Sequence, residues 1–163
     1  MLFRSAAHCI DIMLEDIGKI KTVKTTLEQA KKITSFIYNG QKVVNLMRTY
    51  TQGRDLLSTR ITRFATEFIA IERLIHYQSG LKRMCTSSEW GEFNDERSRN
   101  NTPADMFDLI LTYQFWRTAI LIQSIMEPLV RVLKIVDQYK KPTMSAVYEA
   151  MDRAKLEIGR AHV

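Results

Sequence analysis

A chain of 163 residues that is 45% hydrophobic and 26% charged has the composition of a globular domain, which excludes collagen-like and intrinsically disordered classes. Its 24 lysines and arginines exceed its 18 aspartates and glutamates by six. No apolar run reaches membrane-spanning length and no signal peptide is evident, so we expect a soluble intracellular protein. Cys9 and Cys85 are expected to be reduced thiols, although the sequence also permits a single bridge.

The positive charge is concentrated in one part of the chain. Residues 15–63 carry ten bases and four acids, whereas residues 1–14 and 64–163 are each balanced. One interpretation is a face that contacts phosphates or another polyanion. The other is a lysine-rich surface that only keeps helices soluble. Charge alone leaves both open.

Apolar spacing in the first half predicts helices. Residues at three- and four-residue steps indicate a helix from Ala6 to Ile17, with Gly18 as its stop. A second stripe precedes the break at Asn39-Gly40, and a shorter helix ends near Gly53. After an irregular link at 56–58, a long helix is expected from Thr62, its proposed N-cap. The second stripe consists of Val23, Leu27, Ala30, Ile33 and Ile37.

The second half is predicted to contain a polar loop and three further helical segments. Residues 86–103 are mostly polar, so we expect a loop there. Thr102-Pro103 then has the pattern of a helix start, and 119–136 is apolar on almost every side, with Pro128 bending or interrupting it. A final amphipathic helix begins at Met144. With no strand-like alternation, the prediction is an all-α domain of roughly seven helices. The apolar stripe after Thr102-Pro103 consists of Met106, Leu109, Tyr113, Trp116 and Ile120.

Catalytic and metal-binding patterns are weak. No nucleophile elbow or glycine-rich phosphate loop occurs, and the carboxylates of Asp11, Glu15, Glu149 and Asp152 are interpreted as solvated helix faces. The histidines and cysteines have no metal-ligand spacing, so we expect no metal and no cofactor. They are His8, Cys9, His76, Cys85 and His162.

A nucleic-acid contact is the more specific candidate. Arg60 and Arg63, with Thr62 and Phe64, place two cations and an aromatic ring at a predicted helix N-terminus, whose amide groups favour anions. The alternative is structural, because Phe64 shares helical spacing with the apolar residues that follow and would then lie in the core.

Four blocks resemble a known family. The segments 5–19, 30–39, 61–66 and 127–155, including EPLVRVLKIVDQYKKPTMSAVYEAMDRAK, resemble plant hAT-superfamily transposase-like proteins. The resemblance implies a ribonuclease-H-like core interrupted by a helical insertion, with residues 1–20 as a core helix and 21–163 as the insertion. It also implies nuclear localisation.

The resemblance also assigns individual residues. Ser5 and His8 stand at the Cys and His positions of a C-x-x-H segment, which follows two catalytic aspartates in the family. Those aspartates and the catalytic glutamate would lie outside this chain, so it is expected not to be an enzyme alone. Thr62-Arg63-Phe64 matches a motif whose arginine and aromatic ring approach DNA in these transposases.

Three functional hypotheses follow. The first is a truncated transposase-like fragment that binds DNA at most. The second is a helical interaction or dimerisation module that pairs with itself or with a related transposase-like protein and binds no nucleic acid, which the apolar content of 119–136 motivates. The third is a gene remnant that does not fold stably without the nuclease core.

Overall fold

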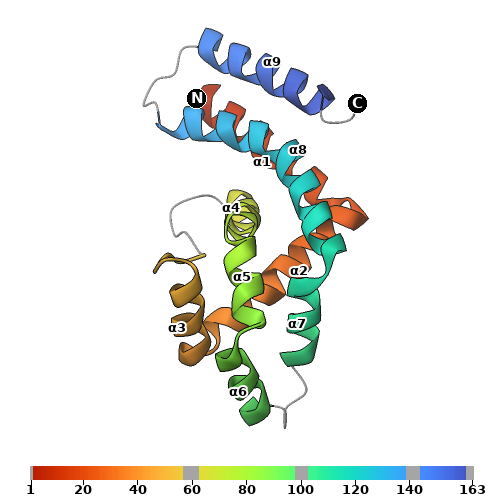
Figure 1. Cartoon of the computed structure of the whole chain (residues 1–163). Helices are drawn as coiled ribbons and strands as arrows, with labels where there is room; N and C mark the ends of the chain where they lie inside the picture. Colours follow the sequence, from red (N-terminus) through yellow and green to blue (C-terminus); the bar gives the residue numbers. More distant parts are fainter. Residues whose placement is uncertain (1, 57–62, 98–102, 139–143, 161–163) are drawn as a thin grey trace.

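The computed structural model describes residues 2–56, 63–97, 103–138 and 144–160, and every regular element within these ranges is an α-helix (Figure 1). The predicted all-α class is therefore confirmed. The described ranges contain nine helices rather than roughly seven. They are α1 (Leu2–Lys19), α2 (Lys21–Tyr38), α3 (Gln41–Tyr50), α4 (Arg63–His76), α5 (Gln78–Cys85), α6 (Ser88–Arg97), α7 (Pro103–Leu111), α8 (Tyr113–Gln138) and α9 (Met144–Arg160).

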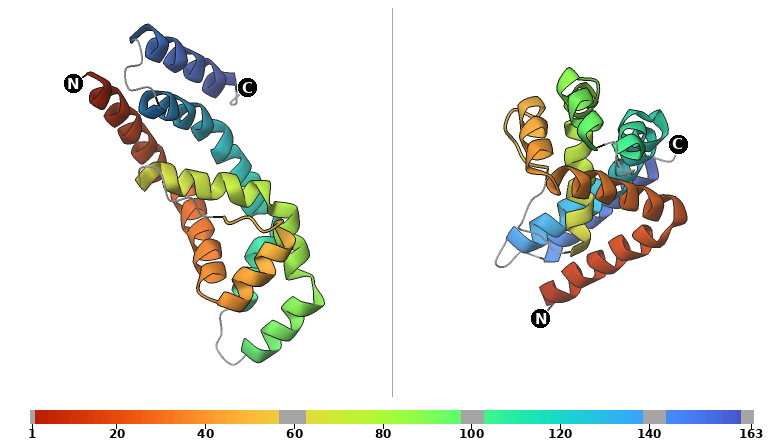
Figure 2. Two further views of the ribbon diagram at one scale, coloured as in Figure 1. Left: turned by 90° about the vertical axis from the view of Figure 1, so that its left-hand side faces the viewer. Right: turned by 90° about the horizontal axis from the view of Figure 1, so that it is seen from below.

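The helices form an elongated body with α9 at one end and α6 at the other (Figures 1 and 2). Its centre consists of α2, α4 and α8, which contact one another, and α1 packs on all three. At the α6 end, α5 contacts α3, α6 and α7. Residues 2–19 therefore share the body of the chain that follows. Their assignment to a nuclease core stays a prediction.

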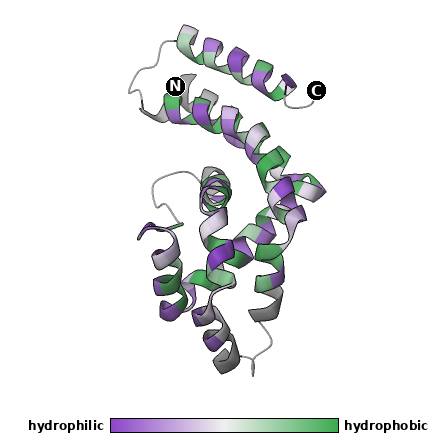
Figure 3. Ribbon diagram, in the orientation of Figure 1, coloured by the Kyte–Doolittle hydropathy of each residue, from purple (hydrophilic) through white to green (hydrophobic). Residues whose placement is uncertain are grey.

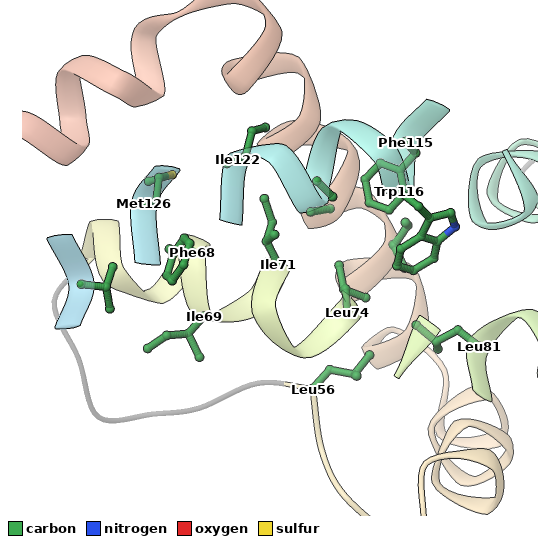
Figure 4. Packing of buried hydrophobic residues seen from close by; sticks show 14 of the residues in the cluster. Leu56, Phe68, Ile69, Ile71, Leu74, Leu81, Phe115, Trp116, Ile122 and Met126 are labelled. Carbon is green, nitrogen blue, oxygen red and sulfur yellow. The ribbon is translucent and has the colours of Figure 1, made fainter. Parts of the chain in front are cut away.

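The hydrophobic core follows α4 and α8. Phe68 and Ile71 of α4 point toward Ile122 and Met126 of α8, and Trp116 closes the core near Leu74 (Figure 4). The core side chains that the structure describes are almost completely buried, with exposed fractions of 8% or less. A buried side chain of this size contributes about 1.5–3 kcal/mol relative to exposure, so apolar burial on these two helices stabilises the fold.

The α7–α8 break was not predicted. A single stripe from Met106 to Ile120 requires one continuous helix, but the chain leaves helical geometry at Thr112. Tyr113 and Ile120 are consequently 70% and 48% exposed instead of buried. The indole nitrogen of Trp116 donates a hydrogen bond of 2.6 Å to the carbonyl oxygen of Ile110. This oxygen lies near the C-terminus of α7, where carbonyl groups lack the backbone amide donor that a further helical turn would supply.

The predicted loop at 86–103 is corrected in part, because α6 occupies residues 88–97. The hydroxyl of Ser87 accepts a hydrogen bond from the backbone amide of Trp90 at 3.3 Å, which is an N-cap contact. The Trp90 side chain is buried and lies edge-on against Phe36, with ring centroids 5.8 Å apart. Among the described side chains of α6, Trp90 is thus the large anchor of a helix whose sequence shows little apolar periodicity.

The C-terminal predictions agree more closely with the structure. Helix α8 continues through Pro128 without interruption and curves along its length (Figure 1). In α9 hydrophobic and hydrophilic residues alternate in blocks along the helix (Figure 3), and Val147 and Ala154 are buried. Within the described residues, no helix combines the length and apolar character that crossing a bilayer requires.

Candidate nucleic-acid interface

Four lysines project from the exposed side of α2. Lys21, Lys24, Lys31 and Lys32 are all exposed, whereas Val23, Ala30, Ile33 and Ile37 on the opposite side are buried. At about 100° per residue, the four lysines fall within an arc of about 100°. We call these four residues the lysine face. Its net charge is positive, because Glu28 is the one acid on the same arc.

Two other bases of the 15–63 stretch, Lys19 and Arg48, are paired with acids beside them. The ammonium of Lys19 lies 3.0 Å from Asp16 and 3.2 Å from Glu15, and the hydrogen bonds to Asp16 and then Glu15 raise its pKa. The guanidinium of Arg48 lies 3.0 Å from the Asp55 carboxylate, and this hydrogen bond raises the pKa of Arg48. Much of the excess in the described part of this stretch is thus left on α2.

The lysines of the lysine face have no such partners. None of the four forms an ion pair with another residue in the described part of the chain. A groove of about 470 Å³ runs along one flank of α2. Lys19, Lys24 and Lys31 in its lining are matched by Glu15, Glu28 and Glu67, so the groove is electrically balanced. Lys24 and Lys31 belong to both the groove lining and the lysine face, whereas Lys21 and Lys32 belong to the lysine face alone, so a polyanion would bind the exposed side of α2 rather than the interior of the groove.

The predicted arginine corner is only partly within the described residues. Arg60 and Thr62 lie outside them, and Arg63 and Phe64 form the first turn of α4, with side chains outside the described set. The helix therefore starts within one residue of the predicted position. Since α4 packs on α2, this N-terminus belongs to the same body as the lysine face.

The residues of the C-x-x-H position lie on α1. His8 is exposed, and Ser5 is one turn earlier on the same helix, with its side chain outside the described set. Across the described residues, no three histidine, cysteine or acidic side chains are grouped so that they could hold a metal ion. Cys9 and Cys85 form no disulfide in the structure; Cys9 is exposed and Cys85 is buried.

The position of an exposed apolar stripe on α8 was not predicted, although the apolar content of 119–136 motivated the interaction-module hypothesis. Tyr113, Ile120 and Leu121 are 70%, 48% and 48% exposed, and Arg117 lies between them at helical spacing. The sequence placed Tyr113 and Ile120 in the core because it continued one helical period through Thr112. The signal that could have shown Tyr113 and Ile120 to be exposed is the indole N–H of Trp116, because a buried indole N–H needs a hydrogen-bond acceptor.

No family model matches this chain, and no match was found among curated proteins or solved structures. The resemblance to hAT transposase-like proteins therefore stays a prediction from the sequence.

Proposed function

We propose that this chain binds DNA through the lysine face of α2 and the adjacent N-terminus of α4. The observation that carries the proposal is the lysine face itself, four exposed cations on one helix without ion-pair partners among the described residues. The resemblance supports the same role for Arg63 and Phe64, and it extends the proposal to nuclear localisation.

The dimensions of the lysine face suit a duplex. Lys21 and Lys32 are eleven residues apart, about 16 Å along a helix axis. Over that length a DNA duplex carries roughly ten phosphate charges, counting both strands, so each lysine can meet a phosphate. Such contacts depend on backbone charge rather than on base sequence. The proposed binding is therefore sensitive to salt and tolerant of sequence.

The test is fluorescence anisotropy of the protein with labelled duplex, hairpin-ended and single-stranded DNA across a salt series. In one variant the four residues of the lysine face are changed to Gln. We expect the slope of log affinity against log salt to become shallower by up to about 3.6, at about 0.9 per lost phosphate contact. A matched variant removes four exposed cations from α8 and α9 by changing Arg117, Arg153, Lys155 and Arg160 to Gln.

The control separates a local contact from an effect of total charge, because both variants lose four positive charges. Equal loss of affinity in the two variants would contradict the lysine face as the contact. Arg63→Ala and Phe64→Ala are expected to weaken hairpin-ended and single-stranded DNA most, through lost phosphate and stacking contacts. A folded protein that binds no DNA at low salt would refute the proposal as a whole.

The proposal is binding without catalysis, as the resemblance implies. The purified protein is incubated with supercoiled plasmid and Mg²⁺ or Mn²⁺, and we expect no nicking above a buffer control. Metal-dependent nicking that disappears when a single carboxylate is changed would contradict this part.

A second candidate function rests on the apolar stripe of α8. Nearly half of the Ile120 and Leu121 surfaces is exposed, which favours contact with a second copy or a related helical protein. Analytical ultracentrifugation over a wide concentration range tests it, with Ile120→Lys as the variant. A species that is strictly monomeric throughout would contradict this candidate.

A further inference from the structure

A polar groove of about 610 Å³ lies between the segment that follows α3 and helices α4 and α8. Its lining comes from segments far apart in the sequence, and it contains no residue of the lysine face. We call it the α3–α4–α8 groove. Its polar and aromatic lining consists of Arg54, Asp55, Glu72, Arg73, His76, Tyr77 and Lys134, with Ile69 as an apolar wall.

The charge of this groove is positive. The carboxylate of Asp55 accepts hydrogen bonds from Arg48 at 3.0 and 3.3 Å, so its charge is offset outside the groove. That leaves Glu72 as the other acid in the lining, against Arg54, Arg73 and Lys134. Arg54 and Lys134 are exposed, and neither forms an ion pair with a described residue. The balance favours an anion.

The backbone that presents Arg54 is fixed before any ligand arrives. Its carbonyl oxygen accepts a hydrogen bond of 2.9 Å from the hydroxyl of Thr51, a buried residue. Arg73 donates to the carbonyl oxygen of Asp55 at 2.7 Å, which ties this segment to α4. Leu56 is fully buried, and its amide donates to the hydroxyl of Tyr38 at 2.8 Å. Binding therefore requires little ordering of the chain.

The turn after α3 adds to this rigidity. The amide of Gly53 donates to the carbonyl oxygen of Arg48 at 2.8 Å, and Gln52 and Gly53 have φ values of 57° and 75°. This is the Schellman arrangement of a helix C-terminus. It directs the chain from α3 straight into the groove at Arg54.

An aromatic pair stands in the same lining. The rings of His76 and Tyr77 meet edge to face, with centroids 4.7 Å apart and planes at 85°. His76 is exposed, and Ile69 lies on the side of α4 away from Met126 (Figure 4). The groove thus combines cations with two aromatic rings and an apolar wall, which suits a phosphate attached to a flat ring system.

We propose that the α3–α4–α8 groove binds the phosphate monoester of a nucleotide, with Arg54 and Lys134 on the phosphate and His76 against the base. The volume lies within the range of small-molecule sites. Two sources share this chemistry, a free mononucleotide and the 5′-phosphorylated end of a DNA strand. The inference goes beyond DNA-backbone binding at the lysine face and does not depend on it.

The test is a titration followed by the backbone amide signals of isotope-labelled protein at constant ionic strength. The probes are adenosine 5′-monophosphate, adenosine and inorganic phosphate. We expect saturable shifts near Arg54 and His76 with adenosine 5′-monophosphate, weaker binding of inorganic phosphate and none of adenosine. Absence of saturation, or equal binding of adenosine and its monophosphate, would overturn the proposal.

Variants assign the contacts. Lys134→Gln should lower the affinity for the monophosphate about tenfold, the usual effect of losing one hydrogen bond to a charged group. Lys155→Gln, an exposed lysine on α9, is the matched control and should leave affinity unchanged. His76→Ala should weaken the monophosphate but not inorganic phosphate. Equal losses in Lys134→Gln and Lys155→Gln would overturn the assignment.

The two sources are distinguished with short single strands that carry either a 5′-phosphate or a 5′-hydroxyl. Tighter binding of the phosphorylated strand, lost in Lys134→Gln, identifies a strand end. Equal binding of the two strands, with the monophosphate still saturating, identifies a free nucleotide. The variant without the lysine face should bind the monophosphate like the parent. DNA binding at the lysine face and monophosphate binding in the groove are therefore tested independently, and either can fail while the other holds.

Discussion

The contact between α3 and α5 gives a prediction opposite to that of helix propensity. Gly80 lies inside α5, where alanine is normally more stable than glycine by about 1 kcal/mol. A Cβ at this position would overlap the backbone carbonyl oxygen of Tyr50 and lie 3.3 Å from its carbonyl carbon. Gly80→Ala should therefore force the two helices apart.

The magnitude follows from the atoms involved. The obstacle is backbone, and it belongs to the last residue of α3, whose end is held by the hydrogen bond from Gly53 to Arg48. Forcing an extra carbon into a packed contact costs about 1–3 kcal/mol. We expect Gly80→Ala to lower the free energy of unfolding by about that amount. For a chain of this size, each kcal/mol lowers Tm by about 2–4 °C.

Gly91→Ala in α6 is the matched control, since a Cβ there meets no atom within 4 Å and the residue is exposed. This variant should gain up to about 1 kcal/mol from propensity alone. Urea and thermal unfolding followed by circular dichroism compare the two variants with the parent. If Gly80→Ala is stabilised as much as Gly91→Ala, the close approach of α5 to α3 is wrong.

Three further predictions test the core. Trp116→Phe should lower the free energy of unfolding by about 1–3 kcal/mol in urea titrations, because the carbonyl oxygen of Ile110 loses its 2.6 Å hydrogen bond; an unchanged midpoint would contradict this. Trp90→Ala should cost about 3–5 kcal/mol if α6 is anchored as described, whereas a loosely attached segment would lose almost nothing. Burial raises the pKa of Cys85 to about 12, so iodoacetamide at pH 8 should modify exposed Cys9 and spare Cys85 until denaturant is added, as mass spectrometry can follow.

The shifted thiol also fixes the direction of a pH effect. The native state keeps the proton of Cys85 up to about pH 12, whereas the unfolded chain releases it near 9.0. The native state therefore binds more protons between these values, and this group lowers the free energy of unfolding as pH rises through that interval.

Local signals were sufficient for several helix boundaries. Pro103 begins α7 as its pattern predicts, and Met144 begins α9. The Asn39-Gly40 break separates α2 from α3 because Gly40 takes an extended conformation before the new helix. These helix starts and breaks depend on a few neighbouring residues, so they can be predicted directly from the sequence.

Tertiary contacts decided what the sequence could not. The break at Thr112 shows no glycine or proline, and it is stabilised by Trp116, four residues later. Among the described side chains of helix α6, the buried ring of Trp90 packs against Phe36 from a distant part of the chain. Neither contact has a periodic signature, so apolar spacing extended one helix too far and missed another.

The charge distribution was also only partly predictable from the sequence. A count of bases located the positive stretch, but it gave Lys19 and Arg48 the same weight as Lys21 and Lys32. Ion pairs offset the charges of the first two, and only the fold shows which bases are paired. The reverse holds for Lys134, which belongs to a region of zero net charge and still lines the most basic groove described above. Electrostatic attraction depends on local charge rather than on the total charge of the protein. Variants that remove the same number of charges from different faces therefore distinguish which surface binds the anion.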